Sequence, residues 1–231
     1  DEGICFTDVD FYYQNSRVAA LQDINFCLRK GETKAIIGST GSGKTTLIQL
    51  LMRDFDAYGG QISINGSPVQ CTPRRQISET VTVVPQVSFL FSGSVRDNLR
   101  IGKADATDDE IWEILEIVQM ADHFRASPDG LATHIAQGAV NLSGGQQQRL
   151  SIARGLIRDS DYYVFDDCFS ALDYATEKRI RTAIQQRLTG KGVLVVAQRV
   201  ATVQNADEIL VLERGCILDS GTHDHLLENS S

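Results

Sequence analysis

The N-terminal part of the chain alternates between apolar and polar residues. Residues 4–11 and 24–28 each alternate with a period of two, and turn-forming residues lie between them. This pattern is typical of strands that bury one face. Residues 61–64 belong with these strands. We therefore expect an antiparallel β subdomain in this part of the chain.

The later apolar runs differ because they are continuous. Residues 81–84, 162–165 and 193–197 are short and rich in β-forming residues. Strands of a parallel sheet that is covered by helices on both faces have this character. The sequence thus predicts an α/β fold with a parallel core sheet.

A helical segment separates the first two of these runs. Residues 108–118 place apolar side chains on one helix face behind a cap at Thr107 and Asp108. Trp112 lies beside this stripe, and we interpret it as packing at the edge of the core. The apolar stripe comprises Ile111, Ile114, Leu115 and Val118.

Composition sets the size of the domain and excludes some classes of partner. The chain has 231 residues and 42% hydrophobic content, enough for one large domain with lobes. We assign residues 1–231 to this domain, with a helical subdomain at about residues 87–160. The 22 basic and 30 acidic residues give a net charge of −8, which argues against a nucleic-acid-binding surface.

The cysteines show no spacing typical of metal ligands. We expect all of them to be free thiols in a reducing compartment. They are Cys5, Cys27, Cys71, Cys168 and Cys216.

A glycine-rich segment directly follows the apolar residues 35–37. Residues 38–45 read GSTGSGKT, match the pattern G-x-x-x-x-G-K-[ST] of phosphate-binding loops and open an apolar helical segment. Glycines let the backbone turn its N–H groups toward a phosphate, and the start of a helix adds its positive dipole end. In this pattern Lys44 reaches the β- and γ-phosphates and Thr45 binds Mg²⁺. The predicted nucleotide-binding residues of this segment are Gly38, Ser39, Thr40, Gly41, Ser42, Gly43, Lys44, Thr45 and Thr46.

A second motif, LSGGQ at residues 142–146, continues into a helical segment. With the phosphate loop, it makes the chain resemble the nucleotide-binding domain of ABC (ATP-binding cassette) transporters from about residue 9 to residue 227. Gln86 of a Q-loop, YYVFDD at residues 162–167 (Walker B) and SALD at residues 170–173 (D-loop) follow in the family's order. The resemblance implies the P-loop NTPase fold of an ABC ATPase, with a helical signature subdomain and with ATP and Mg²⁺ as ligands.

The resemblance also implies further ligand contacts. Gln86 and Asp166 would join Thr45 around Mg²⁺. In FYY at residues 11–13, the family's aromatic-x-Tyr spacing selects Tyr13 as a platform that stacks on the adenine. We expect Tyr12 and Tyr13 to point to opposite faces of a strand. Simple packing of both tyrosines is the alternative.

Two positions depart from the hydrolysing members of the family. The catalytic glutamate is replaced by Asp167 and the switch histidine by Gln198. The missing methylene withdraws the carboxylate by about 1.5 Å, and a displacement near 1 Å can lower a rate on the order of 10²-fold. Glutamine can neither carry positive charge nor pass a proton. We interpret Asp167, Gln198 and Gln86 as a degenerate catalytic site.

The signature is intact despite these changes. In the family two domains meet head to tail, and each signature binds the nucleotide held by the other domain. The residues predicted to act on a partner's nucleotide are Ser143, Gly144, Gly145, Gln146 and Asp173. The combination predicts the degenerate half of a heterodimeric exporter of the multidrug type, weak or inactive as an ATPase alone. A regulatory ATP-binding module and a homodimeric ATPase are the alternatives.

Residues 89–99, FLFSGSVRDNL, resemble the segment of exporters that packs against the membrane domain, and ordinary core packing is the alternative. No run approaches the roughly 18 apolar residues of a membrane span, and no signal peptide opens the chain. We therefore expect the transmembrane domain on a missing N-terminal segment or a separate chain, and this domain at the cytoplasmic face of the membrane. Gln137 departs from exporters, which usually have an acidic residue before this glycine, Gly138.

Overall fold

The structure is a computed structural model that describes residues 3–56 and 58–229. The chain divides into two compact units. Unit 1 holds the chain up to Thr82, the segment Ser160–Asp166 and the chain from Gly190 onward, and unit 2 holds Val83–Asp159 and Asp167–Thr189.

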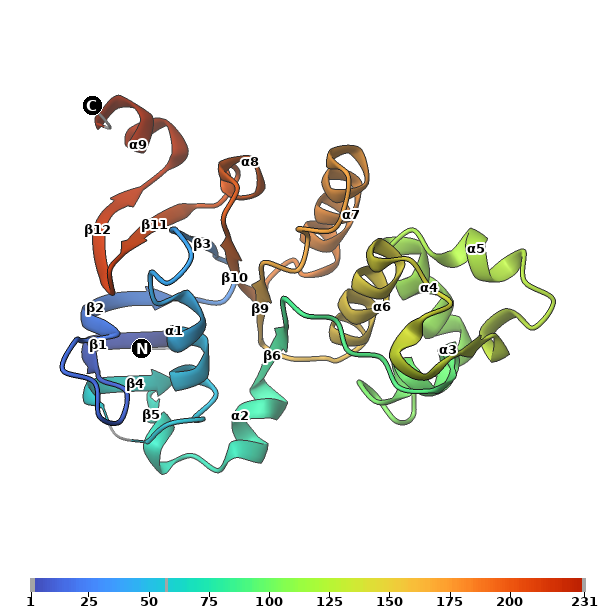
Figure 1. The fold of residues 1–231 in the computed structure, drawn as a ribbon, viewed down its shortest axis with the longest axis horizontal. Helices are drawn as coiled ribbons and strands as arrows, with labels where there is room; N and C mark the ends of the chain where they lie inside the picture. The colour runs from blue at the N-terminus through green and yellow to red at the C-terminus, as the bar shows by residue number, and fades with distance from the viewer. Residues whose placement is uncertain (1–2, 57, 230–231) are drawn as a thin grey trace. The chain divides into compact units, whose positions relative to one another are not determined.

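An antiparallel sheet forms the N-terminal part of unit 1 (Figure 1). Its strand order is β2-β1-β4-β5. Its strands are β1 (Ile4–Phe11), β2 (Leu21–Leu28), β4 (Gly59–Ile64) and β5 (Ser67–Pro68). The predicted antiparallel β subdomain is thus confirmed.

Strand β1 does not keep a strict period of two. Asp8 has a φ of 48°, and the register with β2 shifts between Phe6 and Val9. Thr7 and Asp8 are therefore both exposed, and Val9 returns to the core with no exposed surface. Such a bulge bends a strand locally.

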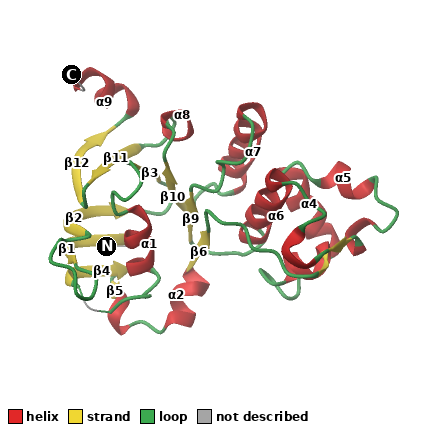
Figure 2. Cartoon of the chain, viewed as in Figure 1, coloured by secondary structure: helices red, strands yellow, loops and turns green. Residues whose placement is uncertain are grey.

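The core sheet has the strand order β12-β11-β3-β10-β9-β6 (Figure 2). Pairing is parallel among β11, β3, β10 and β9, which confirms the predicted parallel sheet. The edge strand β12 is antiparallel to β11 and was not predicted. The strands are β3 (Thr33–Ile37), β6 (Val81–Val84), β9 (Tyr162–Asp166), β10 (Gly192–Ala197), β11 (Glu208–Glu213) and β12 (Cys216–Gly221).

Short helices accompany the sheets of unit 1. They are α1 (Lys44–Leu51), the 3-10 turn Val69–Cys71, α2 (Arg74–Thr80), α8 (Val200–Val203) and α9 (His223–Asn229). Helix α8 packs on β3 and β10, where Val203 joins Ala35 and Ala197 in a buried cluster. Helix α1 lies beside the antiparallel sheet (Figure 1).

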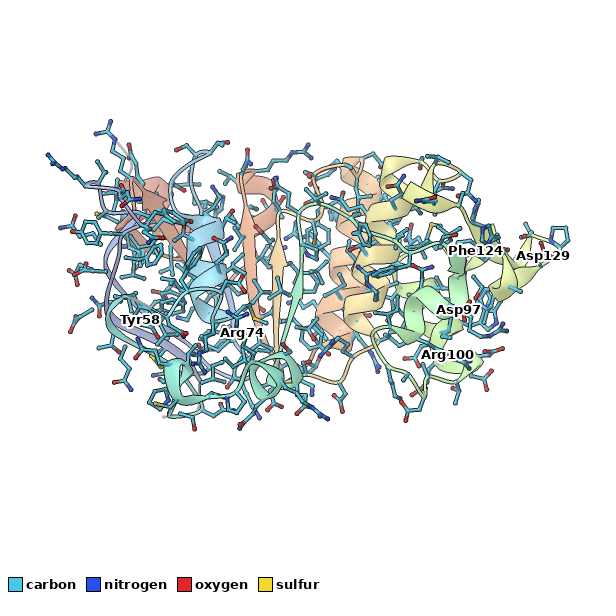
Figure 3. The ribbon with its side chains drawn as sticks, turned by 60° about the horizontal axis from the view of Figure 1, so that its bottom comes forward. Tyr58, Arg74, Asp97, Arg100, Phe124 and Asp129 are labelled. Atoms are coloured by element: carbon cyan, nitrogen blue, oxygen red, sulfur yellow. A yellow bond between two sulfur atoms is a disulfide. The ribbon has the colours of Figure 1, made fainter. Side chains whose placement is uncertain are left out.

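Unit 2 is mainly helical. Its helices are α3 (Val95–Arg100), α4 (Asp108–Ile117), α5 (Ala121–Arg125), α6 (Gly144–Leu156) and α7 (Tyr174–Arg187), with 3-10 turns at Gly130–Ala132 and Gln137–Ala139. A small hairpin joins β7 (Gly93–Ser94) to β8 (His134–Ile135). Helix α6 packs on α3 and α4. Figure 3 labels Phe124 of α5, which is fully buried, and Asp97 and Arg100 of α3.

The apolar stripe predicted for α4 is buried, since Ile111, Ile114, Leu115 and Val118 are at most 1% exposed. Trp112 is partly exposed, and the guanidinium of Arg125 lies 5.2 Å from the centroid of its ring. This contact agrees with Trp112 packing at the edge of the core. A cation over an indole face stabilises such an edge modestly.

The expectation that every cysteine is a free thiol is wrong for Cys5 and Cys27. These residues face each other across β1 and β2, and their sulfurs form a disulfide. Their separation of 22 residues carries no signal of this pairing, because only the strand register brings their Cα atoms to 4.1 Å. The other cysteines, Cys71, Cys168 and Cys216, keep their thiols.

Within residues 3–56 and 58–229, no helix combines the length and the apolar character that a bilayer crossing requires.

Candidate functional site

Three parallel strands of unit 1 end at one edge of the core sheet. Asp166 of β9 pairs with Val196 of β10, and Val196 pairs with Ile36 of β3. The phosphate loop that follows β3, the carboxylate of Asp166 and Gln198 after β10 therefore start from the same level of the sheet. The carboxyl edge of parallel strands is where such folds bind ligands.

Glycines shape the loop between β3 and α1 for two different reasons. A Cβ at Gly38 would lie 2.2 Å from the carbonyl oxygen of Leu212, so only glycine fits there. Gly43 has a φ of 112°, and a Cβ there would lie 2.8 Å from Leu21. The loop thus needs glycine for close packing at its start and for a left-handed turn at its end.

Lys44 folds back over this loop. Its Nζ donates to the carbonyl oxygens of Gly38 at 2.7 Å and Ser39 at 2.8 Å, and lies 3.3 Å from the hydroxyl of Ser42. The residue is only 9% exposed. The ammonium group is thereby fixed inside the turn of the loop, where it would meet a phosphate that the loop surrounds.

Helix α1 begins at Lys44, and no side chain caps its first turn. The backbone N–H groups of a first turn have no partner within the helix, and they attract anions. Thr45 in this turn is exposed, whereas Thr46 is buried. The sequence-predicted loop residues 38–46 are therefore assembled around one helix start.

Tyr13 lies beside α1. The prediction that Tyr12 and Tyr13 alternate along a strand is wrong, because β1 ends at Phe11. The hydroxyl of Tyr13 lies 2.8 Å from the hydroxyl of Thr46 and donates to Oε1 of Gln49 at 3.3 Å. The residue remains 40% exposed, so part of it is accessible to a ligand.

Two residues near Tyr13 were not predicted from the sequence. Gln49 lies one helical turn after Thr46, so the sequence spacing alone indicates that the two side chains share a helix face. Phe55 has its ring centroid 5.6 Å from that of Tyr13. No pattern in the sequence links these two rings, which only the tertiary structure brings together.

The predicted magnesium ligands suit Mg²⁺ in kind. Thr45 offers a hydroxyl, Asp166 a carboxylate and Gln86 an amide oxygen, all hard oxygen donors. Among the described residues, no three His, Cys, Asp or Glu side chains gather as a metal site. This donor set fits Mg²⁺, which is usually held by one or two carboxylates together with phosphate oxygens and water.

In unit 2 the structure joins two of the three predicted catalytic positions. Nε2 of Gln86 donates to Oδ2 of Asp167 at 3.0 Å. Asp167 has a φ of 43°, a left-handed conformation in which aspartate is several-fold enriched over most residues. Gln198 follows β10 in unit 1, where its side chain is exposed.

The signature residues open helix α6. Ser143 caps the helix: its hydroxyl accepts from the backbone N–H of Gln146, and the Gln146 side chain accepts from the backbone N–H of Ser143. A Cβ at Gly144 would meet no atom within 4 Å, whereas one at Gly145 would lie 3.4 Å from the carbonyl oxygen of Ala171. Asp173 caps α7 by accepting from the N–H of Thr176.

An exposed apolar segment follows Gln86. Val87, Phe89 and Phe91 are 78%, 61% and 47% exposed, and the two phenylalanine rings meet edge to face at 4.9 Å. The buried Asn98 holds the backbone of Phe91 through two hydrogen bonds of 2.9 and 2.8 Å. Rings exposed on a fixed backbone are typical of a surface that binds a partner. Leu90 and Leu99 of the same stretch are buried.

Comparison with known proteins finds relatives of this chain. Residues 21–170 match the family described as ABC transporter. An uncharacterized ABC transporter ATP-binding protein of Mycobacterium tuberculosis (strain ATCC 25618 / H37Rv) is 43% identical over 94% of this chain and 38% of its own. The probable multidrug resistance ABC transporter ATP-binding/permease protein YheI of Bacillus subtilis (strain 168) is 40% identical over 98% of this chain and 39% of its own.

Among solved structures, a bacterial Atm1-family ABC exporter with ATP bound superposes with a TM-score of 0.93. It is 30% identical in sequence, and the match covers 99% of this chain and 40% of that one. This chain therefore spans well under half the length of these relatives.

Proposed function

This chain belongs to the ABC transporter family, and from that premise we propose that it is the ATP-binding domain of an exporter. The observation that carries the proposal is the position of Lys44, fixed inside a glycine-shaped loop at the carboxyl edge of the sheet that also holds Asp166. The loop and the first turn of α1 bind the phosphates of ATP, and Thr45, Asp166 and Gln86 bind its Mg²⁺. Tyr13 stacks on the base.

The export function is supported by the relatives. The Bacillus subtilis protein is named a multidrug resistance transporter, and the superposed structure is named an exporter. The membrane part that these proteins possess would contact Val87, Phe89 and Phe91, whose exposed apolar side chains suit an apolar partner surface. In this role the domain lies at the cytoplasmic face of the membrane.

We further propose that hydrolysis at this chain's own phosphate loop is weak. Asp167 replaces the long carboxylate and already accepts a hydrogen bond from Gln86. Gln198 replaces the titrating switch residue. Such a domain holds ATP while its Ser143–Gln146 segment and Asp173 complete the nucleotide site of a second, competent ABC subunit in a head-to-tail heterodimer.

The open space around Gly144 supports action on a partner. A glycine in a helix costs up to about 1 kcal/mol relative to alanine, and among the described residues no atom lies within 4 Å of where a Cβ at Gly144 would be. Close approach of a phosphate from outside the chain accounts for it.

One experiment tests the proposal directly. ATP affinity and steady-state turnover are measured with Mg²⁺ for the purified chain and for the double variant Asp167→Glu, Gln198→His. We expect binding with little turnover, and at least a partial gain of turnover in the double variant. Lys44→Ala serves as the control that abolishes tight binding, because it removes the cation that meets the phosphates.

The opposite results assign a different function. Brisk turnover by the unmodified chain would make Asp167 a usable base and favour a homodimeric ATPase. Binding without any gain in the double variant would favour a regulatory module whose occupancy by ATP, rather than turnover, is the signal. Absence of ATP binding would overturn the proposal altogether.

A further inference from the structure

Tyr13 has an orientation that no strand imposes, since β1 ends two residues earlier. Its hydroxyl contacts Thr46 and Gln49 of α1, which fixes the far end of the side chain. A hydroxyl contact at one end leaves the plane of the ring free to rotate. The ring needs further neighbours if it is to offer a fixed face to a base.

Two phenylalanine rings supply these neighbours. The ring of Phe11 stands at 80° to that of Tyr13 with the centroids 5.0 Å apart, and the ring of Phe55 stands at 87° with the centroids 5.6 Å apart. Phe11 and Phe55 also contact each other at 5.2 Å. Perpendicular contacts at these distances are favoured by the charge distribution of aromatic rings, so the three rings fix one another's planes.

The residues before and after Phe55 make hydrogen bonds that fix the backbone on both sides of it, and we call these bonds the bracket. Nε of Arg53 donates to Oδ1 of Asp56 at 2.7 Å, and Nη1 of Arg53 donates to the carbonyl oxygen of Thr72 at 2.8 Å. The side chain of Gln70 donates to the carbonyl oxygen of Asp56 at 3.2 Å. The short segment that carries Phe55 is thereby tied on both sides to the chain around residues 70–72.

Arg53 shows that this segment has a defined conformation. Its φ of 60° is left-handed, which is uncommon for a residue other than glycine and costs free energy. The surrounding contacts hold it there. The turn after α1 therefore directs Phe55 toward Tyr13 in one orientation.

We propose that Phe55 is a positioning residue for the base of the bound nucleotide. It keeps the Tyr13 ring in the plane that stacks on the base, and it does so without touching the phosphates. The inference rests on the proposed nucleotide site, in particular on Tyr13 as the platform. Because stacking reads the flat face of a base and no edge atoms, the device serves any purine nucleoside triphosphate.

The test compares a ligand that has a base with one that lacks it. Dissociation constants for Mg-ATP and for Mg-tripolyphosphate are measured by calorimetry on the chain and on Phe55→Ala. We expect Phe55→Ala to weaken ATP binding about tenfold, within the range that a lost base–aromatic contact gives, and to leave tripolyphosphate binding unchanged. The unchanged tripolyphosphate affinity also serves as proof that the variant is folded.

Three further variants sharpen the result. Phe55→Tyr restores a ring and should bring ATP affinity to within about twofold of the original. Arg53→Ala keeps the ring but removes the bracket, and should give a smaller loss that is again confined to ATP. Tyr13→Ala should give at least the loss seen with Phe55→Ala, because it removes the platform itself.

The other possible outcomes distinguish failure of this inference from failure of the proposed nucleotide site. If Tyr13→Ala weakens ATP binding and Phe55→Ala does not, the positioning role is wrong and the proposed site stands. Equal weakening of ATP and tripolyphosphate by Phe55→Ala would make Phe55 a support of the phosphate loop, which also overturns the inference. If Tyr13→Ala has no effect on ATP, the platform is misplaced and the inference falls with it, whereas failure of both ligands to bind the unmodified chain rejects the proposed function.

Discussion

At the scale of single residues, two properties of position 167 favour different side chains. Reach toward a water favours glutamate, whereas the backbone conformation favours aspartate. The side chain of Asp167 is one methylene shorter than glutamate, which in the proposed role withdraws the carboxylate from the water that would attack the nucleotide. Its backbone φ of 43° is a conformation that aspartate tolerates better than glutamate. The hydrogen bond from Gln86 uses one oxygen of this carboxylate. These properties are the basis of our proposal that this site holds a nucleotide and hydrolyses it only weakly.

We therefore expect that Asp167→Glu alone raises steady-state turnover by less than about tenfold. The added methylene brings the carboxylate outward, but Gln198 still cannot carry charge or pass a proton, and a proton-transferring group typically contributes on the order of 10²-fold or more. Turnover with saturating Mg-ATP is the measurement, and Asp167→Asn, which keeps the backbone preference without a base, is the matched control. A recovery of 10²-fold or more in Asp167→Glu would identify the short carboxylate as the sole defect.

Among the elements, local sequence patterns predicted those whose structure is decided locally. The alternating strands and the apolar face of α4 follow from spacing within a few residues, and the structure confirms them. The predicted order of strand, glycine-rich loop and helix around residues 38–43 is also present. The bulge at Asp8, the Cys5–Cys27 disulfide and the contact of Phe55 with Tyr13 depend on strand register or on distant segments. No local pattern encodes these. Asp166, Gln198 and the glycine-rich loop start from the same level of the core sheet. This too could be predicted only from the family resemblance or from the pairing of the strands.

Helix α6 begins with Gly144, a glycine that no close contact within the described residues requires. Because a Cβ at Gly144 meets open space, we expect Gly144→Ala to stabilise the folded chain by roughly 0.5 kcal/mol. The same change should weaken Mg-ATP-dependent association with a competent partner subunit, since the methyl group occupies the place of the partner's phosphate. Urea unfolding and sedimentation measure the two effects.

Gly190→Ala is the contrasting control for this variant. Gly190 also faces open space but has a φ of 81°, so alanine there is strained and should destabilise the chain without affecting association. Association unchanged in Gly144→Ala would argue against a signature that acts on a partner.

Helix α3 begins with a capping box formed by Ser94 and the titratable Asp97, and Asp97 is labelled in Figure 3. Hydrogen bonds from the hydroxyl and the backbone N–H of Ser94 hold the pKa of Asp97 below its ordinary value of 3.8, and the nearby Arg96 and Arg100 act in the same direction. A lowered pKa in the folded state stabilises the fold above the ordinary value, and this stabilisation is lost as the pH falls through the lower folded value.

We expect Asp97→Asn to show a smaller loss of unfolding free energy between pH 6 and pH 3 than the original chain, because one linked carboxylate is gone. Urea unfolding at a series of pH values measures it. Asp129→Asn, also in unit 2, is the control. An identical pH dependence in Asp97→Asn and the original chain would show that the cap does not contribute.

At the scale of the whole molecule, the proposed function places ATP binding and contact with a membrane partner in different units of the chain. The phosphate loop lies in unit 1, and the exposed Val87, Phe89 and Phe91 lie in unit 2 directly after Gln86. Gln86 itself bonds to Asp167. The residue next to the exposed surface is thus hydrogen-bonded to the position that we propose for the catalytic base. In the proposed function, this bond would link partner contact to nucleotide chemistry over a short path.

This arrangement predicts that the exposed rings matter for coupling and not for binding. In the full-length transporter, Phe89→Ser with Phe91→Ser should abolish ATP-driven transport while Mg-ATP affinity stays within about twofold, because an interface loses most of its energy with its buried aromatic anchors. Substitution is preferable to deletion of this segment, since Ser94 caps α3 and must remain. Leu218→Ser is the control: this residue is also 61% exposed, but it lies on β12 in unit 1. Transport that survives loss of both rings would contradict the coupling surface and favour an ATP-binding module whose occupancy alone is sensed.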